Sequence, residues 1–82
     1  MDQNILKSII QLFSEILDYP ISKINKDSSS KTVQNWDSLE NINLITAIED
    51  KFNVKFKIEE IENLKKVEDF CIVVENKIID KK

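Results

Sequence analysis

The feature that most constrains the fold is the spacing of the apolar residues in residues 3–17. They recur at intervals of three and four, which places them on one face of an α-helix; they are Ile5, Leu6, Ile9, Ile10, Leu12, Phe13, Ile16 and Leu17. Asp2 precedes the segment and suits a helix N-terminus. Tyr19-Pro20 stops the helix, because a residue before proline avoids the helical region. The chain therefore begins with a predicted amphipathic helix from Gln3 to Leu17.

Three later segments are also predicted to be helical. A second helix runs from Ser38 to Phe52, and its inward face is Leu44, Ile45, Ile48 and Phe52. Asn53 ends it, since Asn tolerates the left-handed cap conformation in a chain without glycine. Residues 59–64 predict a short helix. A last helix covers residues 67–79, with Val67, Phe70, Cys71, Val74 and Ile78 inward. The sequence thus predicts an all-α fold, a small bundle of three long helices and one short one.

Two connections have apolar residues of their own. Residues 18–37 form a long loop rich in turn formers, and Ile21, Ile24, Val33 and Trp36 recur along it. We expect these four side chains to attach the loop to the core, because loops of this length are commonly held down or functional. Residues 54–58 alternate like a strand, but a single strand has no partner. We expect an extended connector that buries Val54, Phe56 and Ile58.

Composition excludes several classes of protein. With 82 residues, a single domain spanning residues 1–82 is expected. The chain has no Gly and no His, which excludes glycine-rich phosphate loops and imidazole chemistry, and its one Cys, Cys71, cannot build a disulfide framework or a cysteine zinc site. A net charge of −3 argues against non-specific nucleic-acid binding. The longest apolar run, Phe70–Val74, cannot cross a bilayer. We expect a cytoplasmic monomer that is not an enzyme, with no catalytic or metal-binding residues.

A possible helix cap stands at the start of the second helix. In Asp37-Ser38-Leu39-Glu40, Asp37 can accept hydrogen bonds from first-turn amides and Glu40 can reach back to the cap. Such capping boxes are common and imply no function. Trp36 does not complete a hydrophobic staple with them, because the partner position holds Asn41. We expect Trp36 to fix the long loop to the bundle instead.

The four predicted helices, the long loop and the string NWDSLENINLITAIEDKFNVKF together resemble an acyl carrier protein. The resemblance extends from Gln3 to about Ile79 and centres on Asp37-Ser38-Leu39. In this family a separate Mg²⁺-dependent phosphopantetheinyl transferase joins 4′-phosphopantetheine from coenzyme A to the serine, and the thiol of that arm holds an acyl group. The resemblance implies attachment at Ser38, with Asp37 helping to position metal and cofactor at the transferase and Leu39 completing the signature. Capping and attachment are compatible.

The resemblance also implies a docking surface on the second helix for the transferase, an acyl- or aminoacyl-loading enzyme and downstream acyl-transfer enzymes. Its expected residues are Glu40, Ile42, Ile45, Thr46, Glu49 and Asp50. Glu49 and Asp50 stand near the predicted C-terminal end, where the helix dipole disfavours carboxylates, so stability alone would not place them there. The alternative interpretation is that they are ordinary solvated charges.

Three departures from the housekeeping fatty-acid carriers bear on the pathway. Trp36 replaces a small residue, the approach to the signature has no glycine, and residues 40–43 are less acidic than is usual. The Trp-Asp-Ser-Leu form, followed by Asn-Leu-Ile-like residues, looks more like the discrete carriers of acyl or aminoacyl groups that serve specialised pathways. A housekeeping fatty-acid carrier is the first alternative, and an unmodified helical adapter is the second.

The apolar interior permits two interpretations. Cys71 is interpreted as a small core residue, which is the usual role of a lone Cys on an apolar helix face. The surrounding aliphatic residues could also part to shelter an acyl chain, although an ordinary core has the same pattern; they are Ile45, Ile48, Ile61, Val67 and Val74.

Overall fold

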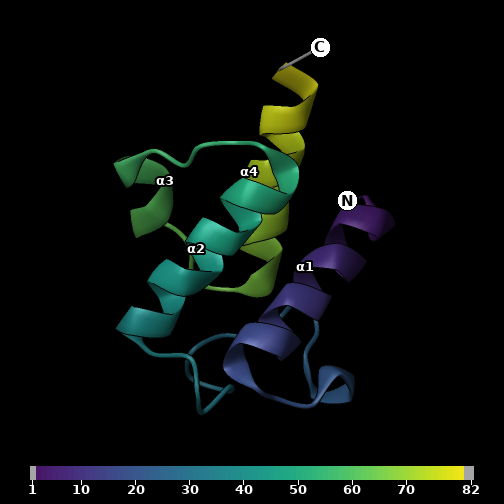
Figure 1. Cartoon of the computed structure of the whole chain (residues 1–82), viewed down its shortest axis with the longest axis vertical. Helices are drawn as coiled ribbons and strands as arrows, with labels where there is room; N and C mark the ends of the chain where they lie inside the picture. Colours follow the sequence, from purple (N-terminus) through teal and green to yellow (C-terminus); the bar gives the residue numbers. More distant parts are fainter. Residues whose placement is uncertain (1, 81–82) are drawn as a thin grey trace.

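The computed structural model describes residues 2–80. Its elements are α1 (Gln3–Leu17), the short 3-10 helix η1 (Ile21–Lys23), α2 (Ser38–Phe52), α3 (Ile58–Glu62) and α4 (Val67–Asp80) (Figure 1). Within residues 2–80 the only β-type pairing is an isolated bridge between Ser29 and Lys66. The predicted all-α bundle of three long helices and one short helix is confirmed. No helix in this part of the chain has the length and apolar character needed to cross a membrane.

The three long helices pack together, and α3 lies to one side of them (Figure 1). α1 contacts both α2 and α4 and is therefore the central packing partner. The loop between α1 and α2 lies at the end of the bundle where α1 stops and where α2 and α4 begin (Figure 1). This arrangement brings the loop, the first turn of α2 and the start of α4 to the same end of the molecule.

The ends of α1 are set by local hydrogen bonds. A carboxylate oxygen of Asp2 accepts from the backbone N–H groups of Asn4 and Ile5, at 2.8 and 3.3 Å. At the other end Asp18 adopts a left-handed conformation with φ of 51°. The helix therefore stops just before Tyr19-Pro20, as predicted. Its buried face is Ile5, Ile9, Phe13 and Leu17.

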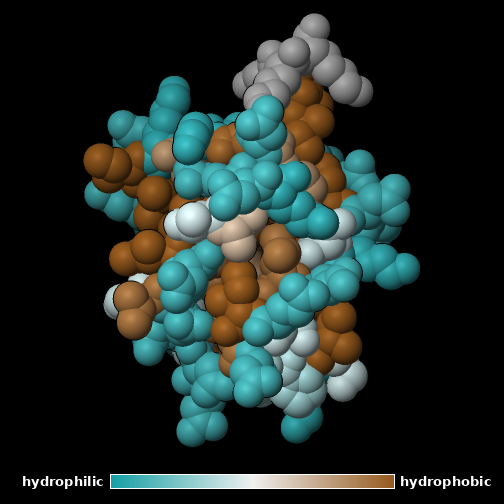
Figure 2. Space-filling model, viewed as in Figure 1, coloured by the Kyte–Doolittle hydropathy of each residue, from teal (hydrophilic) through white to brown (hydrophobic). Residues whose placement is uncertain are grey.

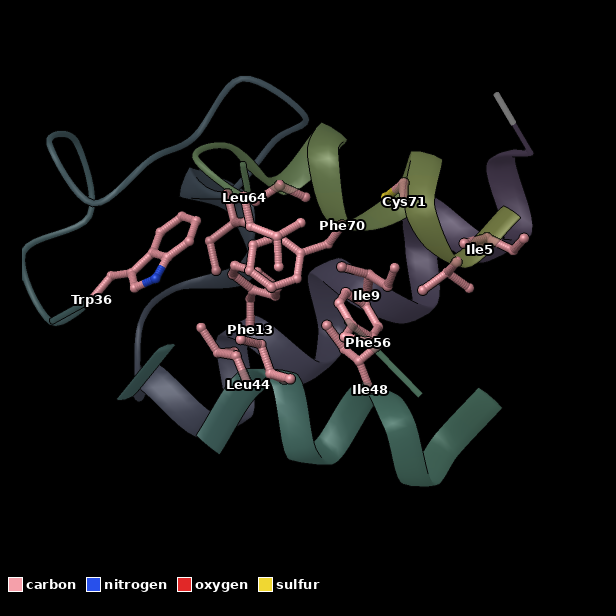
Figure 3. Close-up of a cluster of buried hydrophobic side chains, with 14 of the residues drawn as sticks. Ile5, Ile9, Phe13, Trp36, Leu44, Ile48, Phe56, Leu64, Phe70 and Cys71 are labelled. Carbon is pink, nitrogen blue, oxygen red and sulfur yellow. The ribbon is translucent and has the colours of Figure 1, made fainter. Parts of the chain in front are cut away.

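Four aromatic rings lie close together in the core. Phe13 meets Phe70 edge-on, with ring centroids 5.1 Å apart. Phe56 packs against the other side of the group, 6.4 Å from Phe70. Figure 3 shows these rings between Leu44 and Ile48 of α2 on one side and α4 on the other, with Trp36 at one end of the cluster. The inward face predicted for α2 is confirmed for Leu44, Ile45 and Ile48, whereas Phe52 is partly buried at its edge.

The long loop is anchored by three of its four apolar residues. Ile24, Val33 and Trp36 are buried, whereas Ile21 is 53% exposed. The expectation for Ile21 was wrong because η1 turns all of its residues outward. The loop also supplies backbone acceptors to α4: the carbonyl of Ser28 accepts from Val67 N–H at 3.0 Å. The loop thus satisfies amides that would otherwise lack partners at a helix start.

The connector between α2 and α3 follows the sequence prediction only in part. Asn53 adopts the expected left-handed cap, with φ of 54°. Val54 and Phe56 are buried as predicted, but Ile58 is 74% exposed. The alternation ends there because Ile58 is already the first residue of α3, which begins one residue earlier than predicted and ends at Glu62.

The start and inward face of α4 agree with the prediction. Val67, Phe70, Cys71 and Val74 are fully buried, and Ile78 packs against the core from its edge. Burial raises the pKa of the Cys71 thiol to about 12, and the nearby carboxylates of Glu75 and Glu68 act in the same direction. The interpretation of Cys71 as a core residue is confirmed.

Candidate functional site

The start of α2 is built around the carboxylate of Asp37. Asp37 is the N-cap residue, and its side chain accepts from the backbone N–H of Glu40 at 2.8 Å. The predicted reciprocal bond is wrong: Glu40 does not reach back to the cap. Its carboxylate accepts from the side-chain amide of Asn43 at 3.0 Å instead, because a residue three positions on lies on the same side of the helix.

Ser38 is the first residue of α2 and is exposed. Within residues 2–80 its hydroxyl makes no hydrogen bond, and the backbone N–H groups of Ser38 and Leu39 have no acceptor. Leu39 is 67% exposed beside it. The first turn of α2 therefore presents an accessible hydroxyl beside two free amides, which favour a negative charge.

Trp36 fixes the approach to this turn. Its ring is 5% exposed and meets Phe13 edge-on, with centroids 5.0 Å apart. The indole N–H donates to the side-chain oxygen of Asn41 at 3.0 Å. The preceding residue, Asn35, donates to the carbonyl of Leu17 at 2.8 Å. The loop is therefore attached to the end of α1 and to the first turns of α2, as expected for Trp36.

A groove of about 690 Å³ opens beside Ser38. It lies where three segments meet: the long loop, the first turns of α2 and the junction between α3 and α4. Its lining residues are Ser29, Ser30, Lys31, Trp36, Asp37, Ser38, Asn41, Leu64, Lys65 and Lys66. The sequence analysis missed this groove, because its lysines come from distant parts of the chain and follow no motif.

The predicted docking residues divide into exposed and buried ones. Ile42 is 61% exposed, and Thr46 and Asp50 are also exposed, while Glu40 is half-buried. Ile45 is only 7% exposed and faces the core, so it does not belong to an exposed surface. Helical geometry explains this burial. Leu44 and Ile45 lie four and three residues before Ile48, so the three side chains share the inward face of α2.

Glu49 has a structural role that the sequence did not reveal. Its carboxylate accepts from the backbone N–H of Phe56 at 2.8 Å. The bond ties the last turn of α2 to the connector that follows it, in which Phe56 is buried. The argument that stability alone would not place a carboxylate there is therefore wrong for Glu49.

Exposed apolar side chains on this side of the molecule come from two helices. Leu39 and Ile42 belong to α2, and Ile58 begins α3. Figure 2 shows brown, apolar atoms gathered on the side of the molecule where Figure 1 draws α3 and the start of α2. Ile58 was missed by the sequence analysis, because strand-like alternation pointed it inward.

Within residues 2–80, no three side chains from His, Cys, Asp and Glu come together in a group that would hold a metal ion. The site therefore offers a hydroxyl, amides and a cationic groove.

Comparison with known proteins gives the same family as the sequence. The family described as "Phosphopantetheine attachment site" matches residues 7–74. An acyl carrier protein of Thermosynechococcus vestitus is 32% identical over 74 residues, which cover 90% of this chain and 91% of the relative. An acyl carrier protein of Exiguobacterium sibiricum is 33% identical, over 93% of this chain and 96% of its own. That of Buchnera aphidicola subsp. Baizongia pistaciae is 35% identical, over 88% and 92%.

Proposed function

Because this chain belongs to the acyl carrier protein family, whose members bear a covalent 4′-phosphopantetheine, we propose that Ser38 is the residue that carries the arm. Members of this family are carriers and not enzymes. The cofactor, when attached, supplies the thiol on which an acyl group is held as a thioester. The chain's own residues present the hydroxyl, accommodate the phosphodiester and meet the partner enzymes.

The observation that carries this proposal is the free, exposed hydroxyl of Ser38 at the first residue of α2. Of the other serines that lie near it, Ser28 and Ser29 are engaged, whereas Ser30 is exposed but belongs to the loop and not to a helix start. Ser28 is 5% exposed and accepts from Asn25 N–H, and the Ser29 hydroxyl accepts from Lys31 N–H. Ser38 thus combines accessibility with the unpaired amides of a helix start, which suit a phosphodiester.

Asp37 fits its proposed role without losing its structural one. One carboxylate oxygen accepts from Glu40 N–H, and the side chain is exposed beside Ser38. A carboxylate that is held by a cap and open to solvent can still help to position Mg²⁺ when a transferase brings the metal. Within the proposed site, Leu39 presents an exposed apolar contact next to the attachment point.

The test is the intact mass of the protein after incubation with coenzyme A, Mg²⁺ and a broad-specificity phosphopantetheinyl transferase. We expect a gain of one phosphopantetheine in the wild type and none in Ser38→Ala. Ser30→Ala is the matched control, because Ser30 is an exposed serine that lines the same groove. Loading of Ser38→Ala would refute the assignment, and failure of the folded wild type with several transferases would favour the unmodified adapter.

We further propose a specialised pathway with an acyl or aminoacyl cargo. Support comes from Trp36, whose hydrogen bond to Asn41 and ring contacts form an anchor that a small residue could not provide. The polar residues Asn41 and Asn43 in the first half of α2 also support the proposal of a specialised pathway. The test compares loading of the holo form by a fatty-acid malonyl transferase with loading by aminoacyl- or acyl-activating enzymes. Malonyl transfer as fast as to a fatty-acid carrier would favour the housekeeping alternative.

The proposed partners are the transferase, a loading enzyme and downstream acyl-transfer enzymes, which a cytoplasmic monomer would meet in turn. We assign their docking to the exposed part of α2, with Ile42 and Thr46 at its centre and Glu40 and Asp50 at its margin. Exposure of Ile42, Thr46 and Asp50 supports the assignment, while Glu40 is half-buried. Ile45 is excluded by its burial. Glu49 contributes its charge from a half-buried position.

A further inference from the structure

The groove beside Ser38 differs in charge from the molecule as a whole. The chain has a net charge of −3, yet the groove is lined by three lysines and a single carboxylate, Asp37. The lysines are Lys31 of the loop and Lys65 and Lys66 at the junction before α4. A cationic groove next to the proposed attachment residue of an acidic protein is suited to bind an anion.

These three lysines are not neutralised by neighbours. The ion pairs within residues 2–80 use Lys26 and Lys77, and none involves Lys31, Lys65 or Lys66. The closest acid in sequence, Glu68, pairs with Lys26 at 3.6 Å. The next, Asp69, has a carboxylate that accepts from the backbone N–H groups of Lys65 and Lys66, both at 2.9 Å. That carboxylate caps α4, and the ammonium groups of the two lysines remain available.

The walls of the groove are tied to each other by backbone contacts. Ser29 and Lys66 form an antiparallel bridge, and Val67 N–H donates to the carbonyl of Ser28 at 3.0 Å. Two of the lining side chains, Trp36 and Leu64, are buried at 5% and 9% exposed and form an apolar base. The groove is therefore formed before any ligand arrives, which lowers the cost of ordering one.

We propose that this groove holds the proximal part of the arm against the protein. The proposal rests on the proposed attachment at Ser38. The arm's first group is a phosphodiester, which matches the ammonium groups of Lys31, Lys65 and Lys66. The gem-dimethyl group that follows matches the apolar base of Trp36 and Leu64. The hydroxyl and amides beyond it match the polar side chains of Ser29, Ser30 and Asn41.

Burial of the arm along this groove has a measurable consequence. An arm attached to Ser38 and unrestrained would move freely on the picosecond to nanosecond timescale, as exposed side chains do. An arm held by three lysines is ordered at low salt. It loosens as the salt concentration rises, because ions screen exposed charges over about 10 Å at 0.1 M.

The experiment measures order parameters of the two arm amides by ¹⁵N relaxation, after loading the protein from ¹⁵N-pantetheine coenzyme A. The wild type is expected to give order parameters of about 0.8, close to those of rigid backbone. The variant with Lys31→Gln, Lys65→Gln and Lys66→Gln is expected to fall below about 0.6. The matched control is Lys7→Gln, Lys23→Gln and Lys55→Gln, which makes the same charge change at exposed lysines outside the groove.

Each outcome decides the proposal. Order in the wild type and control, with mobility in the groove variant, supports it. Mobile amides in the wild type overturn it, and so do amides that stay ordered in the groove variant. A second readout is independent of any variant: backbone amides of Leu64, Lys65 and Lys66 are expected to shift between apo and holo protein. Intact mass is measured first, so that a failure of attachment, which refutes the proposed function, is distinguished from a mobile arm.

Discussion

The indole N–H of Trp36 donates to the side-chain oxygen of Asn41 across the first turn of α2, at 3.0 Å. These two residues occupy the positions before and after a helix start that an apolar pair fills in a hydrophobic staple. Here one partner is polar, and the contact is a hydrogen bond beside a buried ring. The hydrogen bond fixes the angle at which the chain enters α2, as the apolar contact does in a hydrophobic staple.

Asn41→Ala is expected to destabilise the protein by about 1–3 kcal/mol, because the indole N–H of Trp36 loses its acceptor in a partly buried place. Asn41→Asp retains an acceptor near a helix N-terminus and should keep the stability of the wild type or exceed it. Urea unfolding followed by tryptophan fluorescence measures both. Equal losses in the two variants would show that the hydrogen bond contributes nothing. Asn43→Ala, at an exposed position on the same helix, is the control.

Asp37 has a capping role and a proposed role at the transferase, and two substitutions separate them. Asp37→Ala removes the acceptor for Glu40 N–H and is expected to cost about 1 kcal/mol. Asp37→Asn retains a good cap, so its stability should change little. If the carboxylate also positions Mg²⁺, loading of Asp37→Asn will be slowed while unfolding is unchanged. Wild-type loading rates in Asp37→Asn would leave Asp37 with the capping role alone.

Glu49 and Asp50 are neighbours with different expected responses. Glu49→Ala leaves the buried Phe56 without an acceptor for its N–H and is expected to cost about 1–3 kcal/mol. Asp50→Ala removes an exposed carboxylate and should change stability by less than about 0.5 kcal/mol. Thermal unfolding distinguishes them. A similar small effect in both variants would remove the structural role assigned to Glu49.

Glu60 links α3 to α4 and makes stability depend on pH. Its carboxylate accepts from Lys57 N–H at 2.7 Å and pairs with Lys77 at 2.8 Å. The Lys57 N–H, followed by Lys77, holds the pKa of Glu60 below its ordinary value of 4.5. A carboxyl with a lowered folded-state pKa binds fewer protons when folded, so its contribution is present above pH 4.5 and is lost as the pH falls through the folded pKa.

Glu60→Gln should therefore flatten the loss of stability below about pH 4.5 and lower stability at neutral pH. Urea midpoints measured across this range test the expectation. Glu62→Gln, at an exposed position of the same helix, provides the comparison. An unchanged pH profile in Glu60→Gln would mean that the link to Lys77 does not stabilise the fold.

Cys71 is expected not to react with thiol reagents in the folded protein. It is fully buried, and burial raises the pKa of its thiol to about 12, so the reactive thiolate is scarce at pH 8. We expect no fast reaction with a chromogenic disulfide in the apo protein and one fast thiol, that of the arm, in the holo protein. Urea should expose Cys71 in both. A fast thiol in native apo protein would show that the core opens readily.

Much of the fold was determined by local sequence. Apolar spacing gave the three long helices and most of their inward faces, since that spacing repeats the helical period within each segment. Asp2, Asp37 and Asn53 were identified as cap residues, because a cap depends on the backbone within a few residues. The signature Asp37-Ser38-Leu39 is also contiguous, so the sequence alone singled out Ser38, and the structure added the exposure of its hydroxyl.

Tertiary structure decided what depends on the path of the chain. In sequence, Ile21 and Ile58 cannot be told from isoleucines that are buried. In the structure both point outward, Ile21 from η1 and Ile58 as the first residue of α3. The bond between Glu49 and Phe56 requires the connector to double back past the end of α2. The lysines of the groove come together where the long loop meets the start of α4, and there the loop carbonyls of Ser28 and Lys26 accept hydrogen bonds from the N–H groups of Val67 and Glu68. Local periodicity carries no information about such long-range contacts, because they depend on which segments pack side by side.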